Sequence, residues 1–286
     1  MTMLSPTPAT TESPRMQMPL RILVGIGSLL LSVAACHAAQ TPQTQPTTLP
    51  ADASALRRVL VLTERGGQHG PFVEAASIWL KDFAAKHQFE LDYVENTKTL
   101  TATSLTRYQV LIQLNYPPYA WTPEAMSAFR EYIEKGKGGW VGFHHATLLG
   151  EFDGYPLWTW FSDFMGGIRY KQYIATFVAA TVHVEDRDHP CMRGLSASFP
   201  VEREEWYTYN RSPRGRVRVL ASVDERSYVP ASSITMGDHP VVWTNEHVAA
   251  RNVYIFMGHG PELLKNPSYT RLFGNAILWA AGQDVP

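Results

Sequence analysis

The amino-acid sequence predicts a three-layer α/β sandwich whose sheet is mostly parallel and becomes mixed in its second half. Short apolar runs alternate with longer amphipathic stretches through residues 57–136, which is the pattern of βαβ units. After residue 144 the helical periodicity weakens and several apolar runs follow one another, which favours additional strands. The chain from about Arg57 onward is long enough to enclose one complete hydrophobic core.

Each predicted element depends on the spacing of its apolar residues. Strands are short apolar or alternating runs, and helices carry apolar residues every three or four positions. Pro123 occupies a favoured early helix position, and Gly136 ends the same helix. The predicted strands cover residues 57–63, 89–94, 108–114, 139–144, 174–184, 216–223, 239–246 and 252–259. The predicted helices cover residues 71–87, 123–136 and 267–282.

The N-terminal segment is predicted to be a signal peptide and not part of the fold. Arg15 and Arg21 precede an apolar run over residues 22–33. That run is too short for a stable membrane span, and small residues follow it closely. Residues 1–35 are therefore expected to direct export and to be removed.

Cys36 is the predicted site of lipid attachment. It ends the run Val33-Ala-Ala-Cys36, which resembles the cleavage box of bacterial lipoproteins, where the cysteine becomes the lipidated first residue. Residues 36–56 are rich in Pro, Thr and Gln and are expected to form a flexible tether. Ordinary signal-peptidase cleavage near Ala38 or Ala39 is the alternative. The first route predicts a lipid-anchored protein of the periplasm or cell envelope, and the second predicts a secreted one.

Charge and cysteine content exclude some classes of partner. Removal of residues 1–35 takes two basic and one acidic side chain from totals of 25 and 26, which leaves a formal net charge of −2. No basic patch suggests nucleic acid, so the membrane is expected to be contacted through the lipid anchor alone. With Cys36 lipidated or removed, Cys191 has no partner for a disulfide, and we expect it to be a small buried apolar residue.

Three histidines are predicted to meet at one edge of the sheet. His69 follows the first predicted strand, His144 ends the strand over residues 139–144, and His259 ends the last strand. Ligands of open α/β sheets bind beyond the carboxyl ends of the strands. A single histidine at a strand end is usually structural, but here each of the three has a glycine within two residues, which lets backbone and ligand approach closely. Imidazole transfers protons near neutral pH, so all three are candidate catalytic residues.

Glu205 is the fourth predicted catalytic residue. In an extended chain Glu204 and Glu205 point to opposite sides, and we expect Glu205 to face inward with Tyr207 while Glu204 faces solvent. Tyr207 and Trp243 are predicted platforms for a substrate, because aromatic ring faces pack on apolar C–H faces such as those of pyranose rings. His145, next to His144, is a further candidate for substrate binding.

No metal site is predicted, because no local ligand spacing such as H-E-x-x-H is present. Three histidines and Glu205 are nevertheless chemically competent ligands for zinc or manganese, so a divalent metal is the alternative.

Several motifs resemble those of the ThuA-like family, which is named for bacterial trehalose utilisation. The motifs are GGWVGFHHAT, DHPCMRGL, EEWYTY, HPVVW, VYIFMGHG and NAILWAAG, in that order. The resemblance covers a predicted domain at residues 57–284. It implies the flavodoxin-like fold of class I glutamine amidotransferases, with His144 near the position of their catalytic cysteine. Two segments depart from the family pattern: ARNVYIF lacks a Gly-Lys-Gly-Arg hairpin, and KQYIA replaces a segment that carries histidine.

Glutamine hydrolysis itself is not expected. It needs a thiolate at the strand-to-helix turn, and the only cysteine of the predicted domain, Cys191, follows Asp-His-Pro in an expected loop. No G-x-S-x-G motif offers a serine instead.

Two functions remain open at this stage. The family resemblance implies an enzyme that handles an oxidised disaccharide made by a separate sugar dehydrogenase. A histidine base would remove the proton next to the keto group, and isomerisation or glycosidic cleavage would follow. The alternative is a lipid-tethered module that binds a sugar without catalysis.

The lipoprotein prediction is tested by Cys36→Ser. The change removes the thiol that would carry the lipid, so the protein is expected to move from the membrane fraction to the soluble fraction, as measured by immunoblotting of fractionated cells. Wild-type protein found in the soluble fraction would favour ordinary export.

Overall fold

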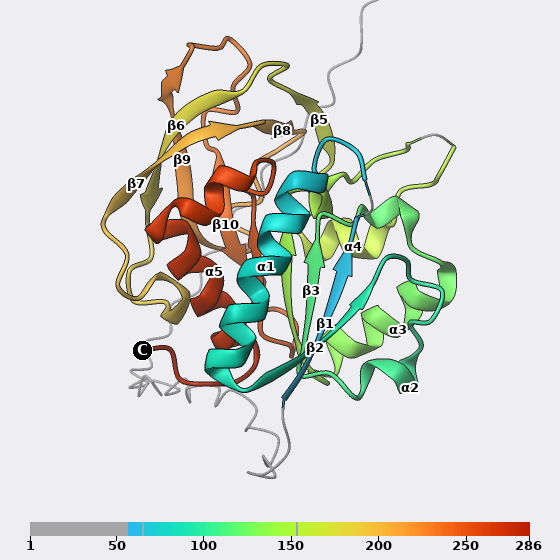
Figure 1. Ribbon diagram of the computed structural model, residues 1–286. Coiled ribbons are helices and arrows are strands. Elements are labelled where there is room, and N and C mark those ends of the chain that lie inside the picture. The colour runs from blue at the N-terminus through green and yellow to red at the C-terminus, as the bar shows by residue number, and fades with distance from the viewer. Residues whose placement is uncertain (1–56, 65, 153) are drawn as a thin grey trace, which may run out of the picture. The chain divides into compact units, whose positions relative to one another are not determined.

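The computed structural model describes residues 57–286 except residues 65 and 153 (Figure 1). The predicted signal peptide at residues 1–35, the tether at residues 36–56 and Cys36 lie outside the described residues. Among the helices of the described part, none combines the length and the apolar character needed to cross a bilayer.

The described residues form one nine-stranded mixed sheet and one two-stranded sheet. The large sheet contains β1 (Arg57–Thr63), β2 (Phe89–Val94), β3 (Val110–Leu114), β4 (Gly139–Phe143), β6 (Val178–Val184), β7 (Ser198–Glu204), β9 (Arg218–Val229), β10 (Pro240–Thr244) and β11 (Asn252–Ile255). Their spatial order is β2-β1-β3-β4-β11-β10-β9-β6-β7. The first five strands in this spatial order, from β2 to β11, pair with one another in parallel. The remaining pairs, from β11 to β7, are antiparallel. The predicted fold class is confirmed.

Helices cover both faces of the parallel half of the sheet. The α-helices are α1 (Gly70–His87), α2 (Ala102–Leu105), α3 (Pro123–Glu134), α4 (Thr159–Phe164) and α5 (Pro267–Ala280). Short 3-10 helices lie at η1 (Pro118–Ala120), η2 (His144–Thr147), η3 (Pro190–Met192) and η4 (Pro261–Lys265). In Figure 1, α1 and α5 lie side by side in front of the sheet, and the rings of Trp79 and Phe273 stack between them at 4.6 Å.

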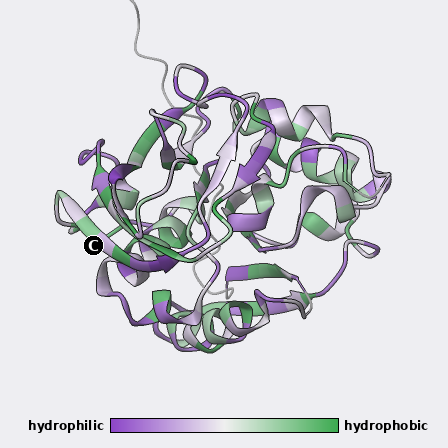
Figure 2. Cartoon of the chain, turned by 90° about the horizontal axis from the view of Figure 1, so that it is seen from above, coloured by the Kyte–Doolittle hydropathy of each residue, from purple (hydrophilic) through white to green (hydrophobic). Residues whose placement is uncertain are grey.

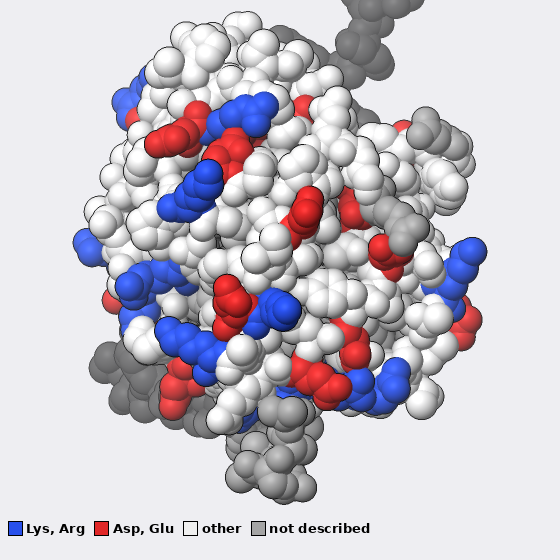
Figure 3. Space-filling view, viewed as in Figure 1, with Lys and Arg blue, Asp and Glu red and all other residues white. Residues whose placement is uncertain are grey.

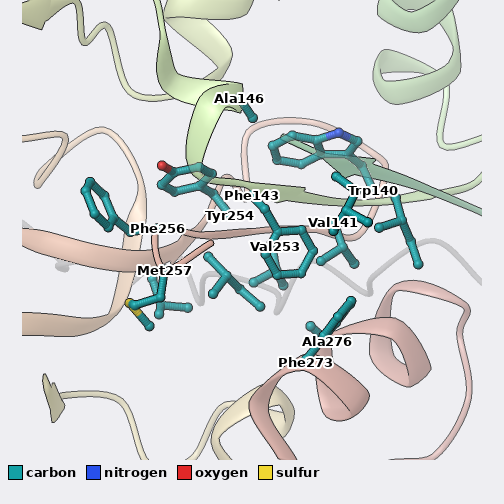
Figure 4. Close-up of a cluster of buried hydrophobic side chains, with 14 of the residues drawn as sticks. Trp140, Val141, Phe143, Ala146, Val253, Tyr254, Phe256, Met257, Phe273 and Ala276 are labelled. Atoms are coloured by element: carbon teal, nitrogen blue, oxygen red, sulfur yellow. The ribbon is translucent and has the colours of Figure 1, made fainter. Parts of the chain in front are cut away.

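Strand β4 shows how the layers pack. Side chains alternate along a strand, so Trp140 and Phe143 face opposite sides of the sheet. The Phe143 ring lies 4.6 Å from Phe273 of α5, whereas Trp140 lies 6.3 Å from Phe129 of α3 and 5.3 Å from Phe164 of α4. Figure 4 shows Trp140 on one side of β4 and the α5 residues Phe273 and Ala276 on the other. Every residue of β4 is buried, because helices cover both of its faces.

The face of the molecule drawn in Figure 3 carries charges of both signs. The helices carry hydrophilic and hydrophobic residues side by side, as expected for elements with one face on the sheet (Figure 2). On the face drawn in Figure 3, acidic and basic side chains are interspersed, with uncharged surface between them.

Some element boundaries differ from the prediction. The strand expected over residues 174–184 begins only at Val178, because the chain leaves β5 (Tyr170–Tyr173) and bends before it enters β6. Strand β9 continues beyond residue 223 through a polar stretch, because its pairing with β6 extends to Val229. Strand β5 and its partner β8 (Tyr207–Tyr209) form the small sheet, and their few residues give little periodic signal.

Gly139 provides a test of the contact between β4 and α5. A Cβ atom at this position would lie 2.2 Å from the backbone oxygen of Ala280, so Gly139→Ala must displace the end of α5. We expect the free energy of unfolding in urea to fall by about 1–3 kcal/mol. In Gly70→Ala the added Cβ would meet nothing within 4 Å, so this control should unfold close to wild type. Equal losses in both variants would contradict the packing described.

Candidate active site

The ends of three strands bring His69, His144 and His259 together. Strands β1, β4 and β11 belong to the parallel half of the sheet, so their carboxyl ends lie at the same edge. The His69 ring centroid lies 5.0 Å from that of His144 and 4.3 Å from that of His259, and the rings of His144 and His259 are 5.6 Å apart. All three side chains are nine-tenths or more buried.

His144 occupies a strained turn between β4 and η2. Its φ of 37° is unusual for a residue with a side chain. The Nδ1 atom lies 3.2 Å from the carbonyl oxygen of Phe256. Because a carbonyl oxygen only accepts, Nδ1 donates this bond, and Nε2 carries the lone pair. Nε2 is buried without a hydrogen-bond partner and lies 3.7 Å from Oε2 of Glu205.

His69 and His259 present further ring nitrogens without partners. His69 immediately precedes α1 but makes no side-chain capping bond to it. Its Nδ1 lies 3.8 Å from Oε2 of Glu64, while its Nε2 is buried without a partner. His259 places Nδ1, also without a hydrogen-bond partner, 3.6 Å from Oε2 of Glu205. Three imidazole nitrogens without hydrogen bonds therefore share one small region.

Both neighbouring glutamates face the protein interior. Glu205 lies at the cluster with its side chain 17% exposed, more than the side chain of any of the three histidines. The expectation that Glu204 faces solvent is wrong, because Glu204 is fully buried. Strand β7 ends at Glu204 and the chain turns before β8 begins at Tyr207, so the alternation of an extended chain does not continue through Glu205.

Glu204 holds the loop that carries His259. Its carboxyl oxygens accept hydrogen bonds from the backbone N–H groups of Gly258 (2.9 Å), His259 (3.4 Å) and Glu205 (2.9 Å). A Cβ at Gly258 would lie 2.9 Å from Cβ of His144, so the loop approaches the cluster closely. This role of Glu204 is not predicted by the alternation of residues along the chain.

Asn115 is a second functional residue that the sequence did not predict. It follows β3 with a φ of 61° and donates from Nδ2 to the carbonyl oxygen of Gly258 at 2.7 Å. The hydroxyl of Tyr269 donates to the carbonyl of Met257 in the same loop at 2.9 Å. A polar residue at the end of a predicted buried strand was the signal that could have identified Asn115.

Burial sets the charge state of His69 and His144. Burial, reinforced by the neighbouring histidines, lowers the pKa of His69 to about 2. Burial also lowers the pKa of His144 to about 4, although Glu205 opposes the change. Both rings are therefore neutral at neutral pH and offer lone pairs.

The pKa values of the two carboxyl groups shift in opposite directions. Burial raises the pKa of Glu204 to about 8, against the effect of the backbone hydrogen bonds. Burial alone would also raise the pKa of Glu205, but His144 and His259 in their protonated forms outweigh it and hold that pKa well below its usual range. Glu205 is therefore the ionised carboxylate of the cluster.

The side chains of Tyr207, Phe177 and Tyr173 form an aromatic rim beside the histidine cluster. Tyr207 packs on His144 with ring centroids 4.5 Å apart, and burial together with the Glu205 carboxylate raises the pKa of Tyr207 well above its usual value. Phe177 lies 4.6 Å from the ring of His259, and Tyr173 lies 6.5 Å from Tyr207. Phe177 and Tyr173 are 37% and 42% exposed, so both can meet a ligand from solvent.

Trp243 does not belong to this aromatic rim. It is 1% exposed, and its ring packs against Tyr254 at 4.4 Å. The expectation that Trp243 is a sugar platform is therefore wrong. Strand β10 is buried along its whole length, and its aromatic residue forms part of the core.

His145 and Cys191 lie outside the four-residue cluster. His145 turns Nδ1 toward Oε2 of Glu64 at 2.8 Å, and its ring lies 3.9 Å from that of His69. Cys191 is completely buried, as expected, and burial raises the pKa of its thiol, so it offers no accessible thiolate.

The cluster has the composition of a ligand set for a metal or a proton-transfer site. His69, His144, Glu205 and His259 each place one nitrogen or oxygen atom so that all four lie within 4.8 Å of one another. Glu64, His69 and His145 form a second group of this kind. Imidazole and carboxylate together suit general acid–base chemistry and divalent transition metals.

Known proteins share the sequence pattern and the fold of this chain. The model of the ThuA family, described as trehalose utilisation, matches residues 58–280. A ThuA-like protein from Bacteroides uniformis ATCC 8492 is 31% identical with a TM-score of 0.72, covering 83% of this chain and 97% of that one. A ThuA-like protein from Parabacteroides merdae ATCC 43184 is 20% identical with a TM-score of 0.59, covering 81% and 92%. No curated protein matches the chain.

A more distant similarity concerns the fold alone. A Thermoplasma acidophilum protein described as one of the subunits of GMP synthase is 12% identical with a TM-score of 0.52, covering 80% of this chain and 96% of that one. The fold is therefore shared with proteins of the class I glutamine amidotransferase type, as expected.

The role of Glu204 is tested by Glu204→Ala. The change leaves the buried N–H groups of Gly258 and His259 without their acceptor, so the free energy of unfolding should fall by at least about 1–3 kcal/mol. Glu202→Ala is the control, because Glu202 lies two residues earlier on the same strand and is exposed. Urea denaturation measures both. A loss for Glu204→Ala no larger than that of the control would show that the carboxyl group does not hold the loop.

Proposed function

The chain belongs to the ThuA family, and we propose that it acts on carbohydrates by acid–base chemistry at the carbonyl group of a keto-disaccharide or a related sugar. One observation carries the proposal: three ring nitrogens without hydrogen bonds and the Glu205 carboxylate meet at the ends of the parallel strands. The family description, trehalose utilisation, favours a disaccharide as the substrate class.

Glu205 is the base in this proposal. A keto group acidifies the C–H bond beside it, so a carboxylate within reach can take that proton while the electron pair moves to the carbonyl oxygen. Glu205 is ionised and is the most exposed member of the cluster, and a substrate would meet it first. The hydroxyl of Tyr207 remains protonated and can donate to the developing enolate oxygen.

The fate of the enolate decides the reaction. Return of the proton to the former carbonyl carbon, with loss of a proton from the neighbouring hydroxyl, moves the keto group by one position and completes an isomerisation. Expulsion of the glycosidic oxygen from the next carbon, with a proton supplied by Glu205, breaks the glycosidic bond. Both outcomes share the first proton transfer, and the cluster is suited to that step.

The aromatic rim supports a sugar as the ligand. Tyr173 is partly exposed beside Tyr207, and the apolar C–H face of a pyranose can pack on its ring. The ring of Phe177, beside His259, is also partly exposed, but the Arg203 guanidinium lies over one of its faces, 3.6 Å from the ring centroid. A keto sugar arises by oxidation of a hydroxyl group, so we propose that the protein acts after a sugar dehydrogenase. We further propose that it does so in the cell envelope, anchored through Cys36.

The proposal is tested with purified protein, 3-keto-trehalose and unmodified trehalose. We expect product, and exchange of the proton beside the carbonyl with solvent deuterium, only from the keto sugar, as measured by nuclear magnetic resonance. Glu205→Gln removes the base and should lower the exchange rate by ~10²-fold or more. His183→Gln is the control, because His183 is half exposed and lies outside the cluster.

The outcomes separate an enzyme from a binding module. Binding of the keto sugar without exchange or product would favour a sugar-binding module and refute the enzyme. Exchange that persists in Glu205→Gln would assign the base to another residue.

A further inference from the structure

We propose that His69, His144, His259 and Glu205 bind one divalent first-row transition metal ion, for which Zn²⁺ is the probe. The four residues come from four separate segments of the chain and meet at one edge of the sheet. Three imidazole nitrogens and one carboxylate oxygen suit Zn²⁺ and its neighbours better than Mg²⁺ or Ca²⁺, which prefer oxygen ligands alone.

The distances fit shared coordination better than hydrogen bonding. Oε2 of Glu205 lies 3.7 Å from Nε2 of His144 and 3.6 Å from Nδ1 of His259, which is too long for a hydrogen bond. Two ligands of a tetrahedral zinc ion, each about 2.0–2.1 Å from the metal, are separated by about 3.3–3.4 Å. All four ligand atoms lie within 4.8 Å of one another, so small side-chain rotations are enough to close the shell.

The orientation of two histidines is the one that metal-binding imidazoles adopt. Such a histidine usually donates its outer ring N–H to a carbonyl or carboxylate, which turns the other nitrogen toward the metal. His144 donates from Nδ1 to the carbonyl of Phe256 and turns Nε2 inward. His69 likewise faces Glu64 with Nδ1, at 3.8 Å, and keeps Nε2 without a partner.

A cation would remove an unfavourable contact within the cluster. With its proton on Nδ1, His144 directs the Nε2 lone pair at the Glu205 carboxylate, so two acceptors face each other without a donor between them. The buried nitrogens of His69 and His259 also have no hydrogen-bond partner. One divalent ion satisfies all of these groups at once, whereas a single proton can satisfy only one pair.

The second group, Glu64, His69 and His145, is the weaker candidate. It offers three ligands and not four, and Glu64 already lies 2.8 Å from Nδ1 of His145. In the proposed site Glu64 would instead orient His69 from outside.

The test measures metal binding without any sugar. Untagged protein is dialysed against a chelator and titrated with Zn²⁺ by calorimetry, with metal content measured by elemental mass spectrometry. We expect one Zn²⁺ per chain and a melting temperature that rises with Zn²⁺ concentration. Parallel titrations with Mg²⁺ and Ca²⁺ should give much weaker binding.

Variants locate the ion. His259→Ala and Glu205→Gln each remove one ligand and should weaken Zn²⁺ binding by at least ~100-fold, more than the loss of an outer partner does. His183→Ala is the matched control, because this half-exposed histidine lies outside both groups, and it should bind Zn²⁺ like wild type. The melting temperature of each metal-free variant verifies folding. If His259→Ala does not fold, the test rests on Glu205→Gln, which is expected to fold because the Glu205 side chain is partly exposed.

Three results would overturn the proposed site. The first is that the wild-type protein does not bind Zn²⁺, and the second is that Zn²⁺ binding survives both ligand replacements. The third is that Zn²⁺ binding is lost in Glu64→Gln but kept in Glu205→Gln, which would place the ion in the second group. The inference does not depend on the proposed function. If the protein binds Zn²⁺ but does not turn over keto sugars, only the proposed function is refuted. If the metal-free protein turns over keto sugars at an undiminished rate, the ion has no catalytic role, but the metal site stands.

Discussion

The arrangement of the candidate site depends on one buried carboxyl group, that of Glu204. It lies where β7 ends and accepts hydrogen bonds from the backbone of the loop after β11, two segments that are about fifty residues apart in sequence. This contact joins the antiparallel extension of the sheet to its parallel half at the edge where the histidines meet. Together with the hydrogen bonds of Asn115 and Tyr269 to the same loop, it fixes the position of His259 relative to Glu205. Such a buried group is costly unless it is hydrogen-bonded, and here the partners are backbone groups that also need an acceptor.

The surrounding cluster is locally unfavourable, and that is informative about function. His144 has a left-handed backbone conformation that costs of order 1–3 kcal/mol, and several buried ring nitrogens have no hydrogen-bond partner. The rest of the domain is well packed: β3, β4, β10 and β11 are buried at every position. Strain and unsatisfied polar groups in an otherwise well-packed fold are characteristic of functional sites, because a ligand or reacting group completes them.

The turn after β4 uses a common feature of the fold for different chemistry. In related α/β folds this turn can present a nucleophile, because it exposes one side chain beyond the end of a buried strand. Here it presents imidazole, and Cys191 is buried within η3. The same backbone geometry therefore supports proton transfer or metal binding, because the side chain and its neighbours determine the chemistry.

The sequence alone located the buried strands and the histidines that follow them, although β11 ends at Ile255 and not at His259 as predicted. His69, His144 and His259 follow buried strands whose apolar runs are local signals, and parallel strands bring their carboxyl ends to one edge. Tertiary structure decided what local alternation could not: that Glu204 is buried, that Asn115 fixes the loop, and that Trp243 is core. Each of these depends on a segment far away in sequence that covers the residue or hydrogen-bonds to it. The burial of a side chain is a property of its neighbours in space, and periodicity along the chain describes only its neighbours in sequence.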